Sequence, residues 1–306
     1  MHDHYHQVIE SALSALAGLQ QPTGEFPTFS ARRLDFSDPQ AYPTSIYTTT
    51  FVVYALRQLA EHRIAAAIRR RAAAFLLSER NSDGSWSYEG RATTRVPADL
   101  DDTACAAAAL LSCGEPVGPE LFRLLWENEA APGGPYYTWI GVNSGEHLLA
   151  RQVDALVQAN LLLFSGLAGI PLAGSAQWLC AMAETDRWDA ASDYCLTPHL
   201  LLFCAARAYA AGAPGLAPLG AALPAAVADL LTPPQEHEPF RLACLAATLG
   251  LAGEHKAAKP YLKALLSCQS PDGAWPGAAS YSGYPPHLDG SPALTTAIAL
   301  EALLAV

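Results

Sequence analysis

Two kinds of helical segment alternate along this 306-residue chain, and their alternation limits its fold more than any other feature. Ala- and Leu-rich stretches with helical periodicity dominate, whereas the alternation typical of strands is almost absent. Six segments carry more of the charged residues, as one-sided outer helices do: 4–20, 62–79, 117–127, 173–184, 217–232 and 256–268. Six others are more apolar, as inner helices are: 46–60, 100–113, 152–166, 197–211, 239–251 and 292–305. We therefore predict an all-α fold, an (α/α)6 barrel with six outer and six inner helices, formed by residues 1–306 as a single domain.

The connections between the segments place the long loops at one end of this barrel. Links from an inner to the next outer segment are short, as at 114–118. Links from an outer to the next inner segment are often long: 20–45, 80–98, 128–151 and 269–291. Long ordered loops on one face of a rigid scaffold usually build a site. The sequence therefore predicts a functional site where the inner helices begin.

Composition narrows the class of protein. With 51% hydrophobic and 15% charged residues, the chain has the material for a sizeable core. A net charge of −11 disfavours nucleic acid as a partner, and no uninterrupted apolar stretch predicts a membrane span. Seven cysteines without a Cys-X-X-Cys pair, and no recognisable secretory signal, predict reduced thiols in a cytoplasmic protein.

A short motif closes three of the outer segments. Segments 19–26, 75–86 and 265–275 each contain a polar residue, then a glycine, then an aromatic residue. The glycine–aromatic pairs are Gly24 with Phe26, Gly84 with Trp86, and Gly273 with Trp275. Glycine permits the positive φ that ends a helix, and the aromatic ring can stack back on the helix end.

An acidic run, Asp99-Leu100-Asp101-Asp102-Thr103, begins the second inner segment. Asp99 suits the N-cap position, and Asp102 lies where a carboxylate favours the helix dipole. Capping alone therefore explains two of the three acids. Asp101 is harder to explain in this way, because a third acid in one turn adds repulsion, and it is our candidate for a functional role.

These residues resemble a known family. The glycine–aromatic copies resemble the repeats of the squalene–hopene cyclase and prenyltransferase superfamily, and Asp99-Leu-Asp101-Asp102-Thr-Ala104 is similar to the Asp-X-Asp-Asp motif of class II terpene cyclases. The resemblance implies protonation-initiated cyclisation of an isoprenoid, a prenyl diphosphate or another polyprenyl substrate. Asp101 would be the general acid, and Asp99 and Asp102 would set its protonation and orientation. Family cyclases usually place the pocket between two barrels, so the long loops, a homodimer or a partner subunit would close it here.

The acid must stay protonated in an apolar cavity, and the resulting cation must be stabilised by aromatic faces. The expected aromatic substrate contacts are Tyr47, Tyr54, Trp86, Tyr137, Trp139 and Tyr284, although the long loops hold other aromatics that cannot be ranked. Asp154 and Asn160 are polar residues on an otherwise apolar inner segment, and Arg95 could meet a diphosphate. The Asp-Asp-X-X-Asp pattern of class I synthases is absent, so no metal or other cofactor is expected, and Mg²⁺ would enter only with a diphosphate substrate.

Three alternatives remain. A non-catalytic isoprenoid-binding or scaffold barrel would need none of this chemistry. A zinc-dependent prenyltransferase-like protein would use a Cys, a His and an Asp as ligands. Its zinc ligands would be Asp193, Cys195 and His287. An α/α-barrel glycosidase would need two separated carboxylates, Asp101 with Asp154 or Glu146.

Overall fold

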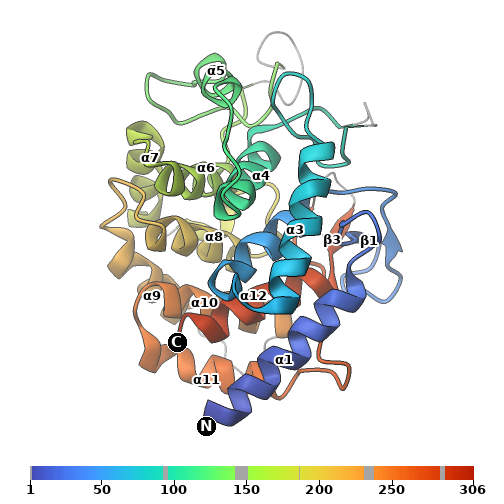
Figure 1. The fold of residues 1–306 in the computed structure, drawn as a ribbon. Coiled ribbons are helices and arrows are strands. Elements are labelled where there is room, and N and C mark those ends of the chain that lie inside the picture. The colour runs from blue at the N-terminus through green and yellow to red at the C-terminus, as the bar shows by residue number, and fades with distance from the viewer. Residues whose placement is uncertain (1, 92–95, 142–150, 186, 231–237, 283–286) are drawn as a thin grey trace.

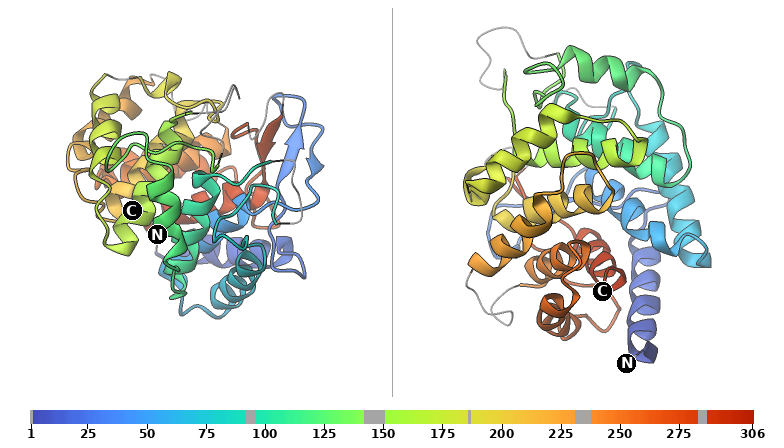
Figure 2. Two further views of the ribbon diagram at one scale, coloured as in Figure 1. Left: turned by 90° about the horizontal axis from the view of Figure 1, so that it is seen from above. Right: turned by 90° about the vertical axis from the view of Figure 1, so that its left-hand side faces the viewer.

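The structure is a computed structural model that describes residues 2–91, 96–141, 151–185, 187–230, 238–282 and 287–306. Within these residues the helices form two rings (Figure 1; Figure 2). The inner ring contains α2 (Tyr47–Ala55), α4 (Leu100–Ser112), α6 (Ala155–Ala168), α8 (Pro198–Ala210), α10 (Pro239–Leu251) and α12 (Pro292–Leu304). Each inner helix packs against the next, and α12 packs back against α2, so the ring closes. The predicted all-α barrel is confirmed.

The outer ring covers the inner one. It contains α1 (His2–Leu19), α3 (Arg63–Ser78), α5 (Glu120–Glu127), α7 (Ala173–Glu184), α9 (Leu219–Asp229) and α11 (His255–Leu266). Short 3₁₀ turns follow α2 at Leu56–Leu59 and precede α8 at Trp188–Ala190. No helix in the described part of the chain combines the length and the apolar character that crossing a membrane requires.

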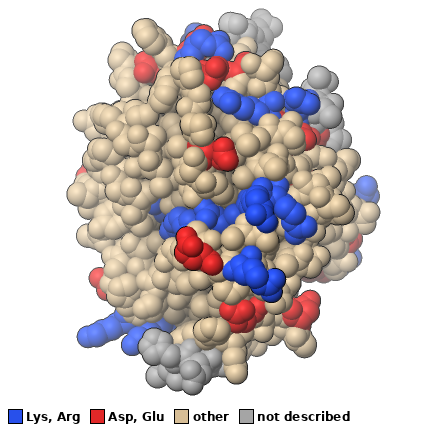
Figure 3. Space-filling view, in the orientation of Figure 1, with Lys and Arg blue, Asp and Glu red and all other residues tan. Residues whose placement is uncertain are grey.

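Burial explains which helices lie inside. The residues of α6 from Ala155 to Ser165 are all buried, as expected for a helix surrounded by others. In contrast, α11 buries only one stripe, Ala258, Leu262 and Leu265. The outer helix α3 exposes several of its arginines, and Figure 3 shows basic side chains gathered over this face of the molecule.

The repeated motif joins three of the outer helices, α1, α3 and α11, each to the inner helix that follows. The indole nitrogens of Trp86 and Trp275 donate to the carbonyl oxygens of Leu76 and Leu265, both at 2.7 Å. The backbone N–H of each motif aromatic donates to a threonine hydroxyl of an inner helix: Phe26 to Thr49, Trp86 to Thr103, and Trp275 to Thr296. The motif therefore sets the spacing between the two rings.

The glycine of the first motif copy has no room for a side chain. Gly24 has a φ of +98°, and a Cβ there would lie 2.2 Å from the carbonyl oxygen of Arg71. Gly114 has a similar φ, +81°, but open space around it. We expect Gly24→Ala to lower the free energy of unfolding by more than about 2 kcal/mol and Gly114→Ala by about 1 kcal/mol, because only the first adds a backbone clash to the strain. Urea denaturation of both variants measures the difference, and equal losses would contradict the close approach.

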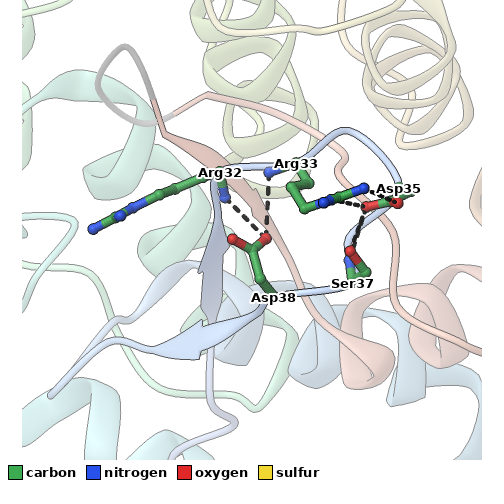
Figure 4. Close-up of polar contacts among 5 residues, drawn as sticks. All are labelled: Arg32, Arg33, Asp35, Ser37 and Asp38. Atoms are coloured by element: carbon green, nitrogen blue, oxygen red, sulfur yellow. Dashed lines mark hydrogen bonds and ion pairs between the residues drawn. The ribbon is translucent and has the colours of Figure 1, made fainter.

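A small antiparallel sheet joins the first and last long loops. Strand β1 (Phe29–Ala31) pairs with β2 (Gln40–Ala41) on one side and with β3 (Leu288–Gly290) on the other. In the β1–β2 connection, Asp38 accepts from the backbone N–H groups of Arg32 and Arg33, and Arg33 also pairs with Asp35 (Figure 4). The sequence analysis missed this sheet because strands of two or three residues are too short to show alternation.

A buried ion cluster fills the interior far from the long loops. Arg207 and Glu301 lie near the C-terminal ends of α8 and α12, with Arg207 Nη2 2.6 Å from Glu301 Oε2. Arg57 Nη1 donates to Glu301 Oε1 at 3.0 Å. The guanidinium of Arg207 also lies over the rings of Phe51 and Phe203, 4.6 and 4.4 Å from their centroids. Burial opposes ionisation of Glu301, but the two arginines hold its pKa below the usual value.

Candidate active site

A cavity opens at the end of the barrel where the long loops lie. The space there that no atom fills is about 430 Å³, which includes open solvent at the mouth. Its walls come from α2, α4, α6 and the loops: Tyr47, Tyr88, Val96, Asp99, Asp101, Asp102, Thr138, Trp139, Leu156, Tyr194, Tyr281 and Ser282. Among the described lining residues the only charged type is aspartate, so the wall combines aromatic rings with three carboxyl groups. This is the end of the barrel at which the sequence predicts a site.

Asp99 caps α4, as its sequence position indicates. Its backbone is extended, with φ −136°, and its carboxylate accepts from the backbone N–H of Asp102 at 2.7 Å. Asp99 and Asp102 are both buried. Burial, and then the charge of Asp99 and a hydrogen bond to it, raise the pKa of Asp102 well above its usual value. Asp99 therefore caps the helix start, and burial disfavours the ionised form of Asp102.

Asp101 faces the cavity from the first turn of α4 and keeps part of its surface exposed. Its Oδ1 accepts from the side-chain amide of Asn160 on α6 at 2.8 Å. The pKa of Asp101 is raised to about 8, mainly by burial and secondly by the charge of Asp99. The hydrogen bond from Asn160 acts in the opposite direction and lowers this pKa. At neutral pH this side chain is therefore mostly a carboxylic acid, which can donate a proton to a molecule in the cavity.

The structure brings some of the predicted substrate contacts to this cavity. Tyr47 and Trp139 line it beside the acids, and Asn160 reaches it through Asp101. Asp154 caps α6 instead: its two carboxylate oxygens accept from the backbone N–H groups of Leu156 and Asp193, each at 2.8 Å. Burial raises the pKa of Asp154 to about 6, although these hydrogen bonds oppose the shift.

Three predicted aromatics are not among the residues that line the cavity. Tyr54 is two turns beyond Tyr47 on α2 and packs its ring against the guanidinium of Arg57, 4.0 Å from the ring centroid. Trp86 is used by the repeat motif, and Tyr137 is not among the lining residues. Arg95, Tyr284 and Glu146 lie outside the described residues.

Other tyrosines occupy the wall in their place. The ring centroid of Tyr281 lies 4.5 Å from that of Tyr47, and the centroid of Tyr88 lies 6.1 Å from Tyr47. Tyr194 meets Trp139 edge-on at 6.4 Å. No sequence signal separates Tyr88 and Tyr281 from the other loop aromatics, because residues between helices have no periodicity that reveals their direction.

A single side chain orients the Trp139–Tyr194 pair. The side-chain oxygen of Gln152 accepts from the indole nitrogen of Trp139 at 2.9 Å and from the hydroxyl of Tyr194 at 2.6 Å. Its amide nitrogen donates to Asp193 at 2.7 Å. Gln152 is thus a positioning residue for two rings of the cavity wall, and the sequence analysis did not single it out.

The zinc alternative is not supported by the geometry. His287 is hydrogen-bonded to Ser30 at 3.1 Å, Asp193 is engaged with Gln152, and Cys195 is paired by its backbone with Tyr281. Across the described residues, no group of three or more His, Cys, Asp or Glu side chains is arranged to hold a metal ion. The proposed ligands Asp193, Cys195 and His287 therefore do not form a zinc site here.

The chain was compared with known proteins. No protein-family model matches it, and no curated protein matches it significantly in sequence. Several solved structures share its fold, including the three that follow. A protein from Actinoplanes has a TM-score of 0.74 and 20% identity over 98% of this chain and 99% of that chain. The type II terpene cyclase MstE from Scytonema, as a variant in complex with its substrate geranylgeranyl dihydroxybenzoate, has a TM-score of 0.72 and 15% identity over 100% and 99%.

The third structure is a GH76 α-mannanase from Bacteroides thetaiotaomicron, with a TM-score of 0.56 and 12% identity over 98% of this chain and 95% of that chain. At such identities the similarity concerns the fold alone. The chain therefore has the α/α toroid fold found in a terpene cyclase and in glycosidases. The resemblance to terpene cyclases is supported at the level of fold, and not to squalene–hopene cyclases in particular.

Proposed function

We propose that this protein is a class II-type terpene cyclase that uses Asp101 to protonate a polyprenyl substrate. The observation that carries the proposal is a carboxylic acid, protonated at neutral pH, in the wall of an aromatic cavity. The π electrons of a terminal alkene would take the proton from Asp101 and leave a tertiary cation. Neighbouring alkenes of the folded chain would then attack the cation in turn, and the electron-rich ring faces would stabilise each new cation.

The substrate is an isoprenoid chain folded over the aromatic wall. The substrate of MstE carries its polyprenyl group on a dihydroxybenzoate. The structural similarity covers 99% of the MstE protein chain, so that cyclase chain too is one barrel of this size. A second barrel is therefore not needed for the proposed reaction, and this chain's own loops wall the cavity. The reaction needs no cofactor, since Asp101 supplies the proton.

The test is incubation of the purified protein with farnesyl and geranylgeranyl diphosphates, squalene, and geranylgeranylated dihydroxybenzoate. We expect one of them to give a cyclic isomer of unchanged mass, detected by mass spectrometry. In D₂O the product should gain one deuterium, because the initiating proton exchanges with solvent through Asp101. If the protein converted none of these substrates, the proposal would be overturned. A cyclic product without deuterium would overturn it as well.

The glycosidase alternative has less support. Two separated carboxyl groups must flank the bond to be cleaved. Asp154, the described candidate to accompany Asp101, has both carboxylate oxygens bonded to backbone N–H groups and is not a lining residue. The scaffold alternative would leave unexplained why an acid with a raised pKa, Asp101, lies in the wall of a cavity.

The contact between Asn160 and Asp101 makes a separate prediction. The amide donor of Asn160 favours the ionised form of Asp101 and so lowers its pKa. In Asn160→Leu the pKa of Asp101 should rise above its present value of about 8. The alkaline limb of the pH–rate profile should therefore move to higher pH. The exposed Gln177→Leu on α7 is the control, and a limb that stays in place in Asn160→Leu would contradict the contact.

A further inference from the structure

A second carboxyl group is connected to the same cavity through phenols. Asp289, on β3, is fully buried. The hydroxyl of Tyr88 donates to Asp289 Oδ2 at 3.2 Å, and the hydroxyl of Tyr42 donates to both carboxylate oxygens at 3.0 and 3.2 Å. The hydroxyl oxygens of Tyr88 and Tyr281 lie 3.0 Å apart. These residues come from three different long loops, so the fold assembles the network at the barrel mouth.

The number of protons fixes the direction of the chain. A phenol has one proton to donate, and Tyr88 gives its proton to Asp289. With that proton on Asp289, Tyr88 accepts in the contact between the two phenols and Tyr281 donates, a direction that the positions of the two oxygens allow. The sequence of donors runs from Tyr281 to Tyr88 to Asp289, and it begins at a ring that lines the cavity. The oxygen of Tyr281 keeps acceptor capacity, because a phenol oxygen has two lone pairs.

Cyclisation must end as well as begin with a proton transfer. The initiating proton comes from Asp101, and the final cation is neutralised when it loses a proton from a neighbouring carbon. The acid cannot serve both steps if the last cation forms at a different part of the folded chain. Asp101 lies on α4, whereas Tyr281 lies on the loop that leads into β3.

We propose, resting on the cyclase function above, that Tyr281, Tyr88 and Asp289 form the path by which the last proton leaves the substrate. The electrons of the C–H bond form the product alkene, and the proton moves to the hydroxyl oxygen of Tyr281. The original proton of Tyr281 passes to Tyr88, and that of Tyr88 passes to the carboxylate of Asp289. The substrate ends neutral, Asp289 ends protonated and later releases its proton to water, and Asp101 regains one. Tyr281 is then the group that touches the reacting atoms.

Tyr42 supplies a matched control. Its hydroxyl binds the same carboxylate, but Tyr42 is not among the lining residues, so it supports Asp289 without lying on the path. Tyr281→Phe removes the path and keeps the ring that packs on Tyr47. Tyr42→Phe removes a hydrogen bond to Asp289 and leaves the path complete.

The experiment compares the products of the wild type, Tyr281→Phe, Tyr88→Phe and Tyr42→Phe on the substrate that the wild type converts. We expect Tyr281→Phe and Tyr88→Phe still to consume substrate through Asp101. The yield of the main alkene should fall about 10²-fold, in favour of isomeric alkenes and of alcohols formed by water capture. Tyr42→Phe should keep the wild-type product ratio. If Tyr281→Phe fails to fold, as thermal melting will show, Tyr88→Phe carries the comparison.

An unchanged product ratio in Tyr281→Phe, or in Tyr88→Phe when the first variant does not fold, would overturn this inference while leaving the cyclase function in place. The same change of ratio in all three variants would also overturn it, because the network would then act only by holding the loops. A wild type that converts no substrate of the panel would overturn the cyclase function and this inference with it.

Discussion

Asp101→Asn is expected to lower the rate of cyclisation by at least about 10³-fold while the barrel stays folded. Asparagine has nearly the same shape and can still contact Asn160, but its amide is not an acid. The rate is measured as product formed from the converted substrate. Asp229→Asn on α9 is the matched control, because that side chain is exposed and far from the acidic turn in sequence, and it should keep the wild-type rate. Undiminished product in Asp101→Asn would remove Asp101 from the mechanism.

The pH dependence follows from the same residue. Asp101 must be protonated to act, and its pKa is raised to about 8. The rate should therefore be independent of this group at lower pH and fall about tenfold per pH unit above the pKa. A general base would give the opposite sign, with activity rising through the same range. A pH–rate profile measured between about pH 5 and pH 10 separates the two.

The raised pKa also has a consequence for stability. An acid whose folded pKa lies above its unfolded value binds its proton more tightly in the native state, so it destabilises the fold as pH rises from the unfolded pKa towards the folded one. Asp101 therefore lowers the stability of the folded protein progressively as the pH rises towards about 8. We therefore expect Asp101→Asn to melt at a higher temperature than the wild type at neutral pH, which also shows that loss of activity is not loss of fold.

Glu301→Ala is expected to lower the free energy of unfolding by about 3–5 kcal/mol. Glu301 is fully buried, and its removal leaves the buried guanidinium of Arg207 without its partner. Urea denaturation measures the loss. The control is Glu127→Ala, which breaks the pair with Arg123 on α5, where both side chains are 53% exposed; it should cost less than about 0.5 kcal/mol.

Two further observations would check that account. A double variant, Arg207→Met with Glu301→Leu, should recover much of the lost stability, because it removes both buried charges and refills the volume. A loss below about 1 kcal/mol in Glu301→Ala would show that the interior is not as dry as the burial of Arg207 implies. Because the pKa of Glu301 is lowered, its stabilising effect should be present above the unfolded pKa of glutamate and disappear as the pH falls through the folded one.

The two rings could be predicted from sequence because the buried side of a helix shows as a periodic pattern of apolar residues. A helix such as α6 is apolar on all sides, while α11 is apolar on one, and this difference is visible without coordinates. The β1–β3 pairing shows no such pattern. It depends on two short extended segments some 260 residues apart, and each was indistinguishable from an ordinary loop.

The candidate site was predictable where it lies on helices and not where it lies on loops. Asp101 and Asn160 stood out as polar residues at the start of, or within, apolar helices. Tyr47 and Tyr54 lie on the same helix, α2. Helical periodicity indicates which side of a helix a residue is on, but not which end of the barrel it reaches. Tyr54 lies two turns further from the cavity end, beside Arg57 of the ion cluster. Trp86 was predicted to contact the substrate, but its indole nitrogen is instead hydrogen-bonded to the end of α3 as part of the repeated motif.

The pairing of β1 with β3 has a consequence for the order of assembly during synthesis. Residues 29–31 leave the ribosome long before their partner strand, residues 288–290, which carries Asp289. The barrel itself also waits for α12 to meet α2. The nascent chain must therefore hold most of its apolar inner helices together without a closed ring until α12 has been synthesised, and during that interval exposed inner faces are open to aggregation. The cavity described above is thus among the last features of the molecule to form.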